Sequence, residues 1–181
     1  GDGTIRGLGF VFKYDDVPAE KPAPLPPATP ATAAPVKLGV IGAGNYASSM
    51  LFPHLAGNAS VEMRHVVTTT SLTAQNAARK FGFRNNGTDA SAVWGDSEIN
   101  AVLIATRHAS HAKLTARALR SGKAVFVEKP LAIDPAGAEE VRLAVVESGN
   151  DRLQVGFNRR FSPVIRAMKD AVSGIKTPLV L

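Results

Sequence analysis

The sequence predicts an α/β fold in which a parallel β-sheet lies between two layers of helices, a three-layer αβα arrangement. Two observations lead to this prediction. From residue 36 onward, short apolar runs alternate with longer segments of helical periodicity, as in successive βαβ units. Most of the apolar runs are rich in Val and Ile, which is typical of strands buried on both faces. The expected strands are residues 37–41, 61–67, 101–105, 124–128 and 153–157.

Two helices are expected to follow the second and third of these strands. The first covers residues 72–81, with Ser71 in front of it and Gly82 at its end. The second covers residues 109–121 and ends at Gly122. Its basic residues fall on one stripe, which we expect to face solvent: Lys113, Arg117 and Arg120.

Two further helices are expected to start where an N-cap residue precedes a proline. Asp134-Pro135 and Ser162-Pro163 both have this pattern. In each helix, an apolar stripe with i, i+3, i+7 spacing is expected to face inward. The two stripes are Ala138, Val141 and Val145, and Ile165, Met168 and Val172.

The composition excludes several classes of protein. The chain of 181 residues has no cysteine, which excludes disulfides, thiolate metal sites and thiol nucleophiles. Its net charge of +6 comes from scattered Lys and Arg residues without interleaved aromatic side chains, so we expect no nucleic-acid partner. No apolar run approaches the roughly 18 residues of a membrane span, and no secretory signal is visible. We therefore expect a cytoplasmic protein without a membrane partner.

The first 35 residues differ in composition from the rest of the chain. Residues 16–35 are rich in proline, separated mainly by Ala and Thr, and predict an extended polyproline-like tether. Residues 1–15 are predicted to hold one strand, at 8–14, which would be the tail of an upstream domain. The folded domain is therefore expected over residues 36–181. The chain starts at Gly1, as an excised fragment or a tag remnant would.

The stretch IGAGNYASSM suggests a ligand. Gly42, Gly44 and Ala47 form the spacing G-x-G-x-x-A directly after the first strand and at the start of a helix. In this context Gly42 permits a tight turn, Gly44 lets the backbone approach a phosphate, and Ala47 allows close helix packing. The amides of Asn45 and Tyr46 would point at the anion. The pattern predicts a Rossmann-type dinucleotide site, and a glycine-rich corner without a ligand is the alternative.

The end of the second strand bears on the choice of cofactor. Sites specific for NAD usually place a carboxylate here, about 20 residues after the glycines. The chain has hydroxyls instead, on Thr68, Thr69, Thr70 and Ser71. Hydroxyls accept the 2′-phosphate that a carboxylate repels. Arg64 or Arg79 could assist, and the alternative is that each is an ordinary surface arginine. Both NAD and NADP therefore stay open, with a tilt toward NADP.

Three further stretches carry a resemblance to a known family. AVLIATRHASHAKLTARALRSG, KAVFVEKPLAI and LQVGFNRRFSP follow the glycine-rich stretch in this order. Together the four resemble the N-terminal domain of the Gfo/Idh/MocA oxidoreductases. The resemblance implies an NAD(P)-dependent enzyme that transfers a hydride between the nicotinamide and a sugar or sugar-like alcohol. The forms ATRHASH and VGFNRRFSP are most similar to a branch fused behind a zinc-dependent alcohol-dehydrogenase-like domain.

The resemblance implies roles for residues at the carboxyl edge of the sheet. Lys129 occupies the position of a lysine that contacts the nicotinamide ribose and the reacting hydroxyl, so it is the expected catalytic residue. Glu128 is expected to bind the ribose or to hold Lys129, and a cis peptide bond is an open possibility before Pro130. Asn158 and Arg160 are expected either at the border of the nicotinamide pocket or in capping and surface ion pairs.

The loop after the third expected strand also resembles a cofactor-binding segment. Thr106 and Arg107 stand where most of the family has Thr-Pro, which leaves the loop geometry open. His108 and His111 stand at positions that line the cofactor ribose and the helix start. No third ligand is near these two histidines in the sequence, so no metal site is expected.

The resemblance further implies a second α/β domain after Leu181. That domain would supply the substrate wall and further catalytic residues, so the chain alone is expected to be inactive, and oligomers could form through it. Two other functions stay open: a non-catalytic module that binds or senses dinucleotides, and a methyltransferase that uses S-adenosylmethionine. The Glu-Lys-Pro segment argues against both, because neither accounts for its lysine.

Overall fold

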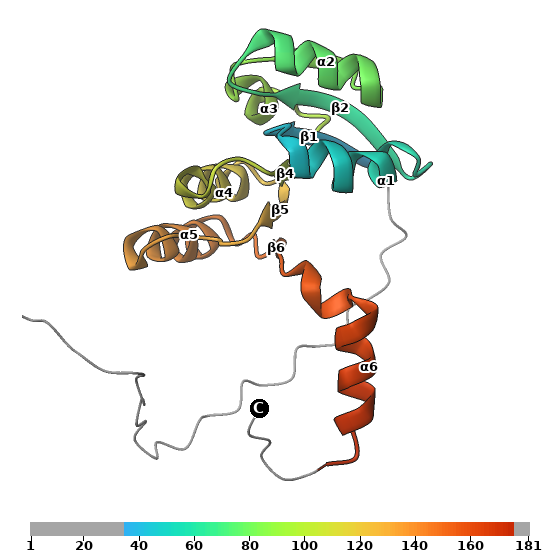
Figure 1. Cartoon of the computed structure of the whole chain (residues 1–181). Helices are drawn as coiled ribbons and strands as arrows, with labels where there is room; N and C mark the ends of the chain where they lie inside the picture. The colour runs from blue at the N-terminus through green and yellow to red at the C-terminus, as the bar shows by residue number, and fades with distance from the viewer. Residues whose placement is uncertain (1–34, 176–181) are drawn as a thin grey trace, which may run out of the picture. The chain divides into compact units, whose positions relative to one another are not determined.

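A six-stranded parallel β-sheet forms the centre of the computed structural model (Figure 1), which describes residues 35–175. The strands are β1 (Val36–Ile41), β2 (Val61–Val67), β3 (Asn85–Gly87), β4 (Ala101–Ile104), β5 (Ala124–Glu128) and β6 (Leu153–Gly156). Their order is β3-β2-β1-β4-β5-β6. This is the strand order of the Rossmann fold, so the predicted fold class is confirmed. The predicted strand at 8–14 and the predicted tether lie outside the described residues.

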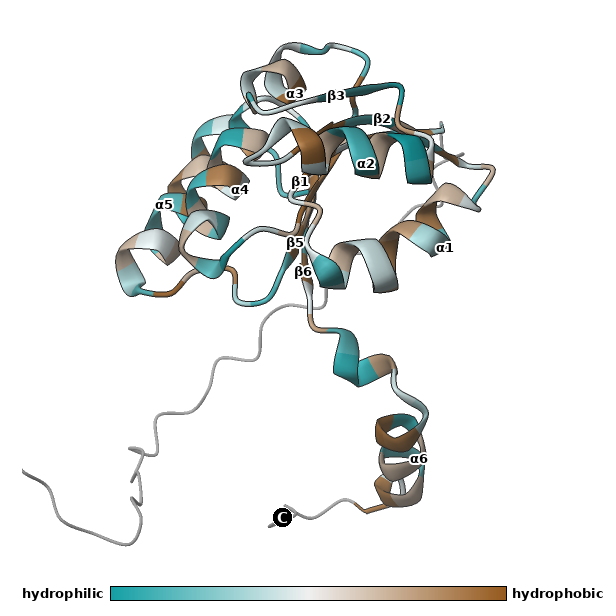
Figure 2. Ribbon diagram, turned by 45° about the horizontal axis from the view of Figure 1, so that its top comes forward, coloured by the Kyte–Doolittle hydropathy of each residue, from teal (hydrophilic) through white to brown (hydrophobic). Residues whose placement is uncertain are grey.

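Helices lie on both faces of this sheet. On one face, a π-helical turn, η1 (Ala47–Leu51), continues into α1 (Phe52–Ala56) and packs beside α2 (Ser71–Phe81). On the other face lie α3 (Ser91–Gly95), α4 (His111–Arg120) and α5 (Pro135–Ser148). Figure 2 shows apolar strands between helices whose outer surfaces are largely hydrophilic. The carboxyl ends of the parallel strands consequently meet at one edge of the sheet, between the two helical layers.

Each face has its own apolar core. On the α1 side, the ring of Phe52 is fully buried and contacts Phe81 and Phe83 edge to face, with centroids 5.1 and 5.6 Å away. On the α4 side, Leu119 and Val127 are fully buried in the second core. Strands that pack against helices on both faces are held in place from both sides, which gives the loops at their carboxyl ends a fixed base.

The five predicted strands agree with the structure to within one residue at each end. β3 was not predicted from the sequence, because Asn85, Asn86 and Gly87 carry no apolar pattern. It pairs with β2 over three residues only, at the edge of the sheet. The short helix α3 was not predicted either, since it buries only Val93 and so shows no apolar stripe.

The helix ends follow the predicted capping pattern with one exception. The carboxylate of Asp134 accepts a hydrogen bond from the Gly137 amide (2.7 Å), and the Ser162 hydroxyl accepts one from the Ile165 amide (3.3 Å). Gly82 ends α2 with a φ of 74°. The exception is the start of α2, where Thr70 and not Ser71 is the N-cap residue.

The predicted helix faces are correct for α4 and partly wrong for α5 and α6 (Pro163–Val172). The basic stripe on α4 is exposed as predicted. In α5, Val141 is buried but Ala138 is exposed, and Ala144 takes its place in the core. In α6, Ile165 and Met168 are 41% and 49% exposed, and no residue of this helix is buried. No helix within residues 35–175 is long and apolar enough to cross a bilayer.

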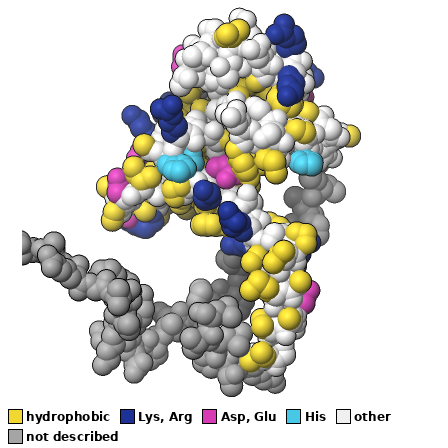
Figure 3. Space-filling model, viewed as in Figure 1, with side chains coloured by type: hydrophobic (Ala, Val, Ile, Leu, Met, Phe, Trp, Pro, Cys, Tyr) yellow, Lys and Arg dark blue, Asp and Glu magenta, His cyan; other side chains and the backbone are white. Residues whose placement is uncertain are grey.

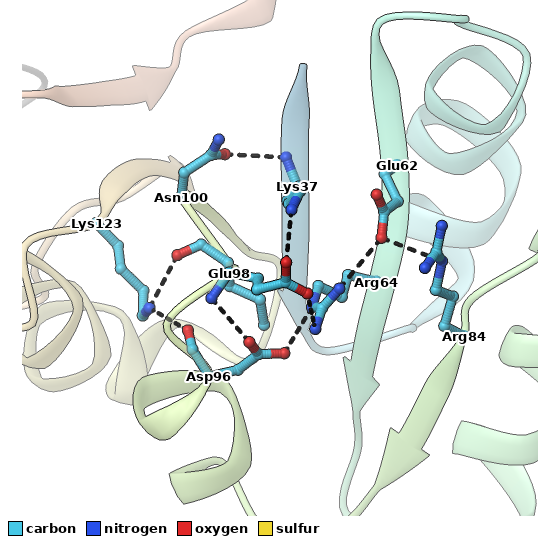
Figure 4. Close-up of polar contacts among 9 residues, drawn as sticks. Lys37, Glu62, Arg64, Arg84, Asp96, Glu98, Asn100 and Lys123 are labelled. Carbon is cyan, nitrogen blue, oxygen red and sulfur yellow. Dashed lines mark hydrogen bonds and ion pairs between the residues drawn. The ribbon is translucent and has the colours of Figure 1, made fainter. Parts of the chain in front are cut away.

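A polar cluster joins the loop between α3 and β4 to β1, to β2 and to the residue before β5 (Figure 4). Arg64 on β2 donates to the carboxylate of Asp96 (2.6 Å), which lowers the pKa of that carboxyl. Lys37 on β1 pairs with Glu98 (2.9 Å). Lys123, buried just before β5, donates to the carbonyl oxygens of Asp96 (2.8 Å) and Ile99 (2.9 Å). Arg64 is therefore committed to this cluster, and the suggestion that it assists in binding a 2′-phosphate is wrong.

Candidate cofactor site at the carboxyl edge of the sheet

The glycine-rich turn after β1 has one structural glycine and one open glycine. Gly42 has a φ of 96°, and a Cβ at this position would overlap the carbonyl group of Ala105. Gly44 is different, because a Cβ there would have no heavy atom within 4 Å. Ala47 is 1% exposed and packs into the core beneath the helix. Gly42 is thus required by the fold, whereas the space above Gly44 is free for a ligand.

The start of the helix faces this space. The amide of Ser48 donates to the carbonyl of Gly44 (3.0 Å), which places Asn45 and Tyr46 in the first turn, where helical amides lack an intrahelical partner. Both residues are exposed. The hydroxyl of Tyr46 accepts a hydrogen bond from the side-chain amide of Asn158 (2.7 Å) in the 3-10 turn η3 (Asn158–Phe161). The glycine-rich turn and the segment after β6 are therefore in direct contact.

The end of β5 carries the two residues that the resemblance singles out. Glu128 pairs with Gly156 of β6, is 8% exposed, and has a buried Oε1 atom with no hydrogen-bond partner among residues 35–175. Lys129 is exposed and is joined to Pro130 by a cis peptide bond. No ion pair joins Glu128 to Lys129 in the part of the chain that the structure describes. The suggestion that Glu128 holds Lys129 therefore has no support from the geometry.

Lys129 lines a cavity of about 370 Å³ with the residues that follow β6: Phe157, Asn158, Arg159 and Arg160. Three of these five side chains are cationic, which favours an anionic ligand. Figure 3 shows Lys and Arg side chains gathered where the chain leaves β6 for α6. The sequence led to Lys129, Asn158 and Arg160 but missed Phe157 and Arg159. The signal that could have found them is their direct adjacency to Asn158 at the end of the sixth strand.

The loop after β4 is held by its own hydroxyls. Thr106 Oγ1 lies 2.7 Å from the hydroxyl of Ser110, a residue that the sequence analysis missed. Arg107 and His108 are exposed at the carboxyl edge. The backbone of Arg107 has φ −72° and ψ 146°, a conformation that proline adopts. Arginine in the family's proline position therefore leaves this loop in the form that proline would give it.

His111 does not line the cofactor surface, and that prediction is wrong. The side chain is 1% exposed. Its Nδ1 lies 2.7 Å from the carbonyl oxygen of Pro130, and its Nε2 lies 3.1 Å from that of Thr106. Both partners are carbonyl oxygens, and a neutral imidazole can donate to one of them, so the ring links the loop after β4 to the loop after β5. Within residues 35–175, His108 and His111 belong to no group of three potential metal ligands.

The hydroxyls at the end of β2 are only partly available. Thr68 is 8% exposed, and its hydroxyl donates to the carbonyl of Thr70 (2.7 Å). The hydroxyl of Thr70 caps α2. The guanidinium of Arg79 donates a hydrogen bond to the side-chain oxygen of Asn76 on the outer surface of α2 (2.8 Å). Thr69, which is exposed, is therefore the residue of this group best placed to meet a ligand.

Residues 36–157 match the family model of Gfo/Idh/MocA, described as an oxidoreductase family with an NAD-binding Rossmann fold. The chain belongs to this family. It is 36% identical over 139 residues to an inositol 2-dehydrogenase of Rhizobium meliloti, a match that covers 76% of the chain and 40% of the relative. It is 32% identical over 131 residues to a 4-carboxy-2-hydroxymuconate-6-semialdehyde dehydrogenase of Sphingobium. This match covers 71% of the chain and 40% of that relative.

Solved structures agree with the sequence matches. A putative myo-inositol dehydrogenase from Sinorhizobium meliloti superposes with a TM-score of 0.68 at 31% identity, over 76% of the chain and 41% of the neighbour. A 3-ketoreductase from Actinomadura kijaniata, in complex with NADP and TDP-benzene, superposes with a TM-score of 0.69 at 27% identity. This match covers 77% of the chain and 42% of the neighbour. The chain thus spans less than half the length of these relatives.

Proposed function

We propose that this domain binds NAD or NADP across the carboxyl edge of its sheet and that the whole protein transfers a hydride between the nicotinamide and a sugar-like alcohol. The observation that carries the proposal is the position of Lys129, at the end of β5 and at the wall of a cationic cavity. The inositol dehydrogenases among the relatives support the substrate class.

The residues of the carboxyl edge fit a dinucleotide. The backbone at Gly44 can be approached without a clash, as a pyrophosphate requires. The buried, unpartnered Oε1 of Glu128 is an acceptor for a ribose hydroxyl. When bound, the cofactor supplies the redox chemistry through its nicotinamide ring. The protein's contribution is to hold the ring beside Lys129.

Lys129 has the chemistry for the reacting hydroxyl. Its ammonium group has three donors on a flexible stem, and it can orient an alcohol oxygen and exchange a proton with it. Asn158 and Arg160 border the same cavity. A module that only senses dinucleotides has no need for an exposed lysine at this place. Whether hydride transfer depends on Lys129 therefore distinguishes an enzyme from such a module.

We also propose that the domain follows a zinc-dependent, alcohol-dehydrogenase-like domain in one long polypeptide. Support comes from the forms ATRHASH and VGFNRRFSP and from the proline-rich composition of residues 16–35. Reading the gene around this segment tests the proposal. A frame that encodes no such domain upstream would contradict it.

Thr69→Asp is expected to shift the preference of the chain toward NAD. The new carboxylate would repel the 2′-phosphate of NADP, and we expect the NADP affinity to fall roughly tenfold relative to that for NAD, about 1.4 kcal/mol. Calorimetric titration with both cofactors measures the ratio, and Thr69→Asn is the uncharged control. An unmutated chain that already favours NAD a hundredfold, about 2.8 kcal/mol, would contradict the predicted tilt toward NADP.

His111→Phe is expected to weaken cofactor binding as well as stability. The substitution removes the ring nitrogens that contact the carbonyls of Pro130 and Thr106, and the carbonyl that loses its hydrogen bond costs about 1–3 kcal/mol of unfolding free energy. It also frees the two loops that carry Lys129 and Arg107. Leu119→Ala is the control, because it removes a buried side chain of the same helix far from either loop. Equal cofactor affinities in the two folded variants would assign His111 to stability alone.

A further inference from the structure

One side-chain hydrogen bond joins the glycine-rich turn to the cavity at Lys129. The side-chain amide of Asn158 donates to the hydroxyl of Tyr46 (2.7 Å), although 112 positions separate the two residues in the chain. Tyr46 lies at the start of the helix after β1, and Asn158 begins η3 after β6. The bond therefore connects the proposed site of the pyrophosphate with the wall beside which the proposed nicotinamide lies.

The place of this bond relative to the sheet matters for the cofactor. β4 and β5 lie between β1 and β6, and with about 4.8 Å between neighbouring strands the ends of β1 and β6 are about 14 Å apart. The bond thus borders the space over the carboxyl ends of β4 and β5. Thr106 and Lys129 lie in the loops after these two strands. A dinucleotide that runs from Gly44 to Lys129 therefore passes alongside Tyr46 and Asn158.

Tyr46 is the better anchored residue of the pair. Its backbone is helical (φ −62°, ψ −50°), and the next residue, Ala47, is buried in the core beneath the turn. Asn158 belongs to a short 3-10 turn in which no residue is buried. The terminal torsion of an asparagine side chain has a broad range, so an amide without a partner takes many orientations. The hydroxyl of Tyr46 restricts this range for Asn158.

The bond to Tyr46 leaves part of the Asn158 amide free. A side-chain amide has one acceptor oxygen and two N–H donors, and Tyr46 takes one donor. Oδ1 and the second N–H of Asn158 have no hydrogen-bond partner among residues 35–175, and the side chain is exposed. Of the described side chains that line the cavity, Asn158 is the one that offers an acceptor, because lysine and arginine are donors only.

We propose that Asn158 binds the carboxamide of the nicotinamide ring and that Tyr46 positions Asn158 for this contact. A carboxamide has the same groups as the Asn158 side chain, an acceptor oxygen and N–H donors, so two hydrogen bonds can join them. The contact fixes the rotation of the ring about its bond to the ribose, and with it the face that the ring turns toward the alcohol. The inference rests on the proposed function, since it takes the ligand to be a nicotinamide dinucleotide.

Cofactor analogues test the contact. Calorimetry of the 181-residue chain compares NAD or NADP, whichever binds more tightly, with the 3-acetylpyridine analogue of the same dinucleotide, in which a methyl group replaces the amide nitrogen. The unmutated chain is expected to bind the analogue roughly tenfold more weakly, because Oδ1 of Asn158 is left without a donor. Asn158→Ala should remove this preference, and Tyr46→Phe should reduce it to about threefold. A preference that is absent from the unmutated chain, or unchanged in Asn158→Ala, would overturn the proposal.

ADP-ribose distinguishes a failure of this proposal from a failure of the proposed function. It lacks the nicotinamide ring, and its 2′-phosphate derivative is used if the chain prefers NADP. Its affinity should be the same in the unmutated chain, Asn158→Ala and Tyr46→Phe. Tight binding of ADP-ribose without any preference for the carboxamide would leave the dinucleotide site in place and overturn the contact with Asn158. No binding of ADP-ribose would contradict the dinucleotide site itself.

A double-mutant cycle tests whether Tyr46 acts through Asn158. If it does, Tyr46→Phe weakens dinucleotide binding in the unmutated chain but has no further effect in the Asn158→Ala chain. Additive losses, or no loss in Tyr46→Phe alone, would overturn the positioning role of Tyr46. Asn76→Ala is the matched control, because Asn76 is exposed on α2 and its side chain bonds Arg79. This variant should bind every ligand as the unmutated chain does.

Discussion

Lys129→Ala in the complete protein is expected to slow hydride transfer by roughly 10²–10⁴-fold, the usual contribution of a positioned proton-transfer group. Lys129 is exposed at the end of β5 and has no ion-pair partner among residues 35–175, so its ammonium is free to meet a bound alcohol. Cofactor affinity should fall much less than the rate, because the glycine-rich turn is untouched. Single-turnover measurement of nicotinamide oxidation or reduction gives the rate.

Two controls belong with this prediction. Lys129→Arg keeps the charge but not the ability to exchange a proton, so it should be slow as well. The 181-residue chain by itself should show no turnover, since it spans 40% of the inositol 2-dehydrogenase that it matches and the alcohol must be pressed against the ring by a partner surface. Unaltered hydride transfer by the Lys129→Ala protein with cofactor bound would place the chemistry elsewhere and leave this domain a binding module.

Gly44→Val is expected to weaken dinucleotide binding at least roughly a hundredfold, about 2.8 kcal/mol, with little loss of stability. A Cβ at Gly44 meets no protein atom, so the fold accepts the side chain, but the valine then fills the space that a pyrophosphate needs. Calorimetry of the 181-residue chain measures the affinity, and thermal unfolding checks the fold.

Gly95→Val is the matched control for Gly44→Val. A Cβ at Gly95, at the end of α3, also meets no atom within 4 Å, but this position is far from the carboxyl edge. It should leave binding unchanged. If Gly44→Val binds NAD or NADP as well as the unmutated chain does, the pyrophosphate does not lie at this turn.

The fold could be predicted because its strands are apolar and its helix ends carry capping residues. Val61–Val67 and Ala124–Glu128 agree with the structure residue for residue. β3 could not be predicted, since an edge strand of Asn-Asn-Gly depends on its neighbour β2 for its hydrogen bonds and not on an apolar pattern. The inward face of α6 was predicted from periodicity alone, which identifies an apolar stripe but not the surface that covers it.

The candidate site could be predicted in its residues but only partly in their roles. The glycine spacing correctly led to a turn with Gly42 in a left-handed conformation and Gly44 in open space. The burial of His111 and of the Thr68 hydroxyl could not be read from the sequence. His111 contacts the backbone carbonyls of Pro130 and Thr106, and the Thr68 hydroxyl donates to the carbonyl of Thr70, so both depend on how loops fold. Residues at ligand-binding positions and residues that support them look alike until these partners are known.

The most direct test of the account is chemical protection of Lys129 by bound cofactor. The 181-residue chain, with and without saturating NADP, is treated with an amine-acylating reagent, and the rate at each lysine is followed by peptide mass spectrometry. Lys80 and Lys113, which are exposed on α2 and α4, serve as internal references. The account predicts that NADP slows acylation of Lys129 severalfold and leaves both references unchanged. Calorimetric evidence of NADP binding together with an unchanged rate at Lys129 would contradict it.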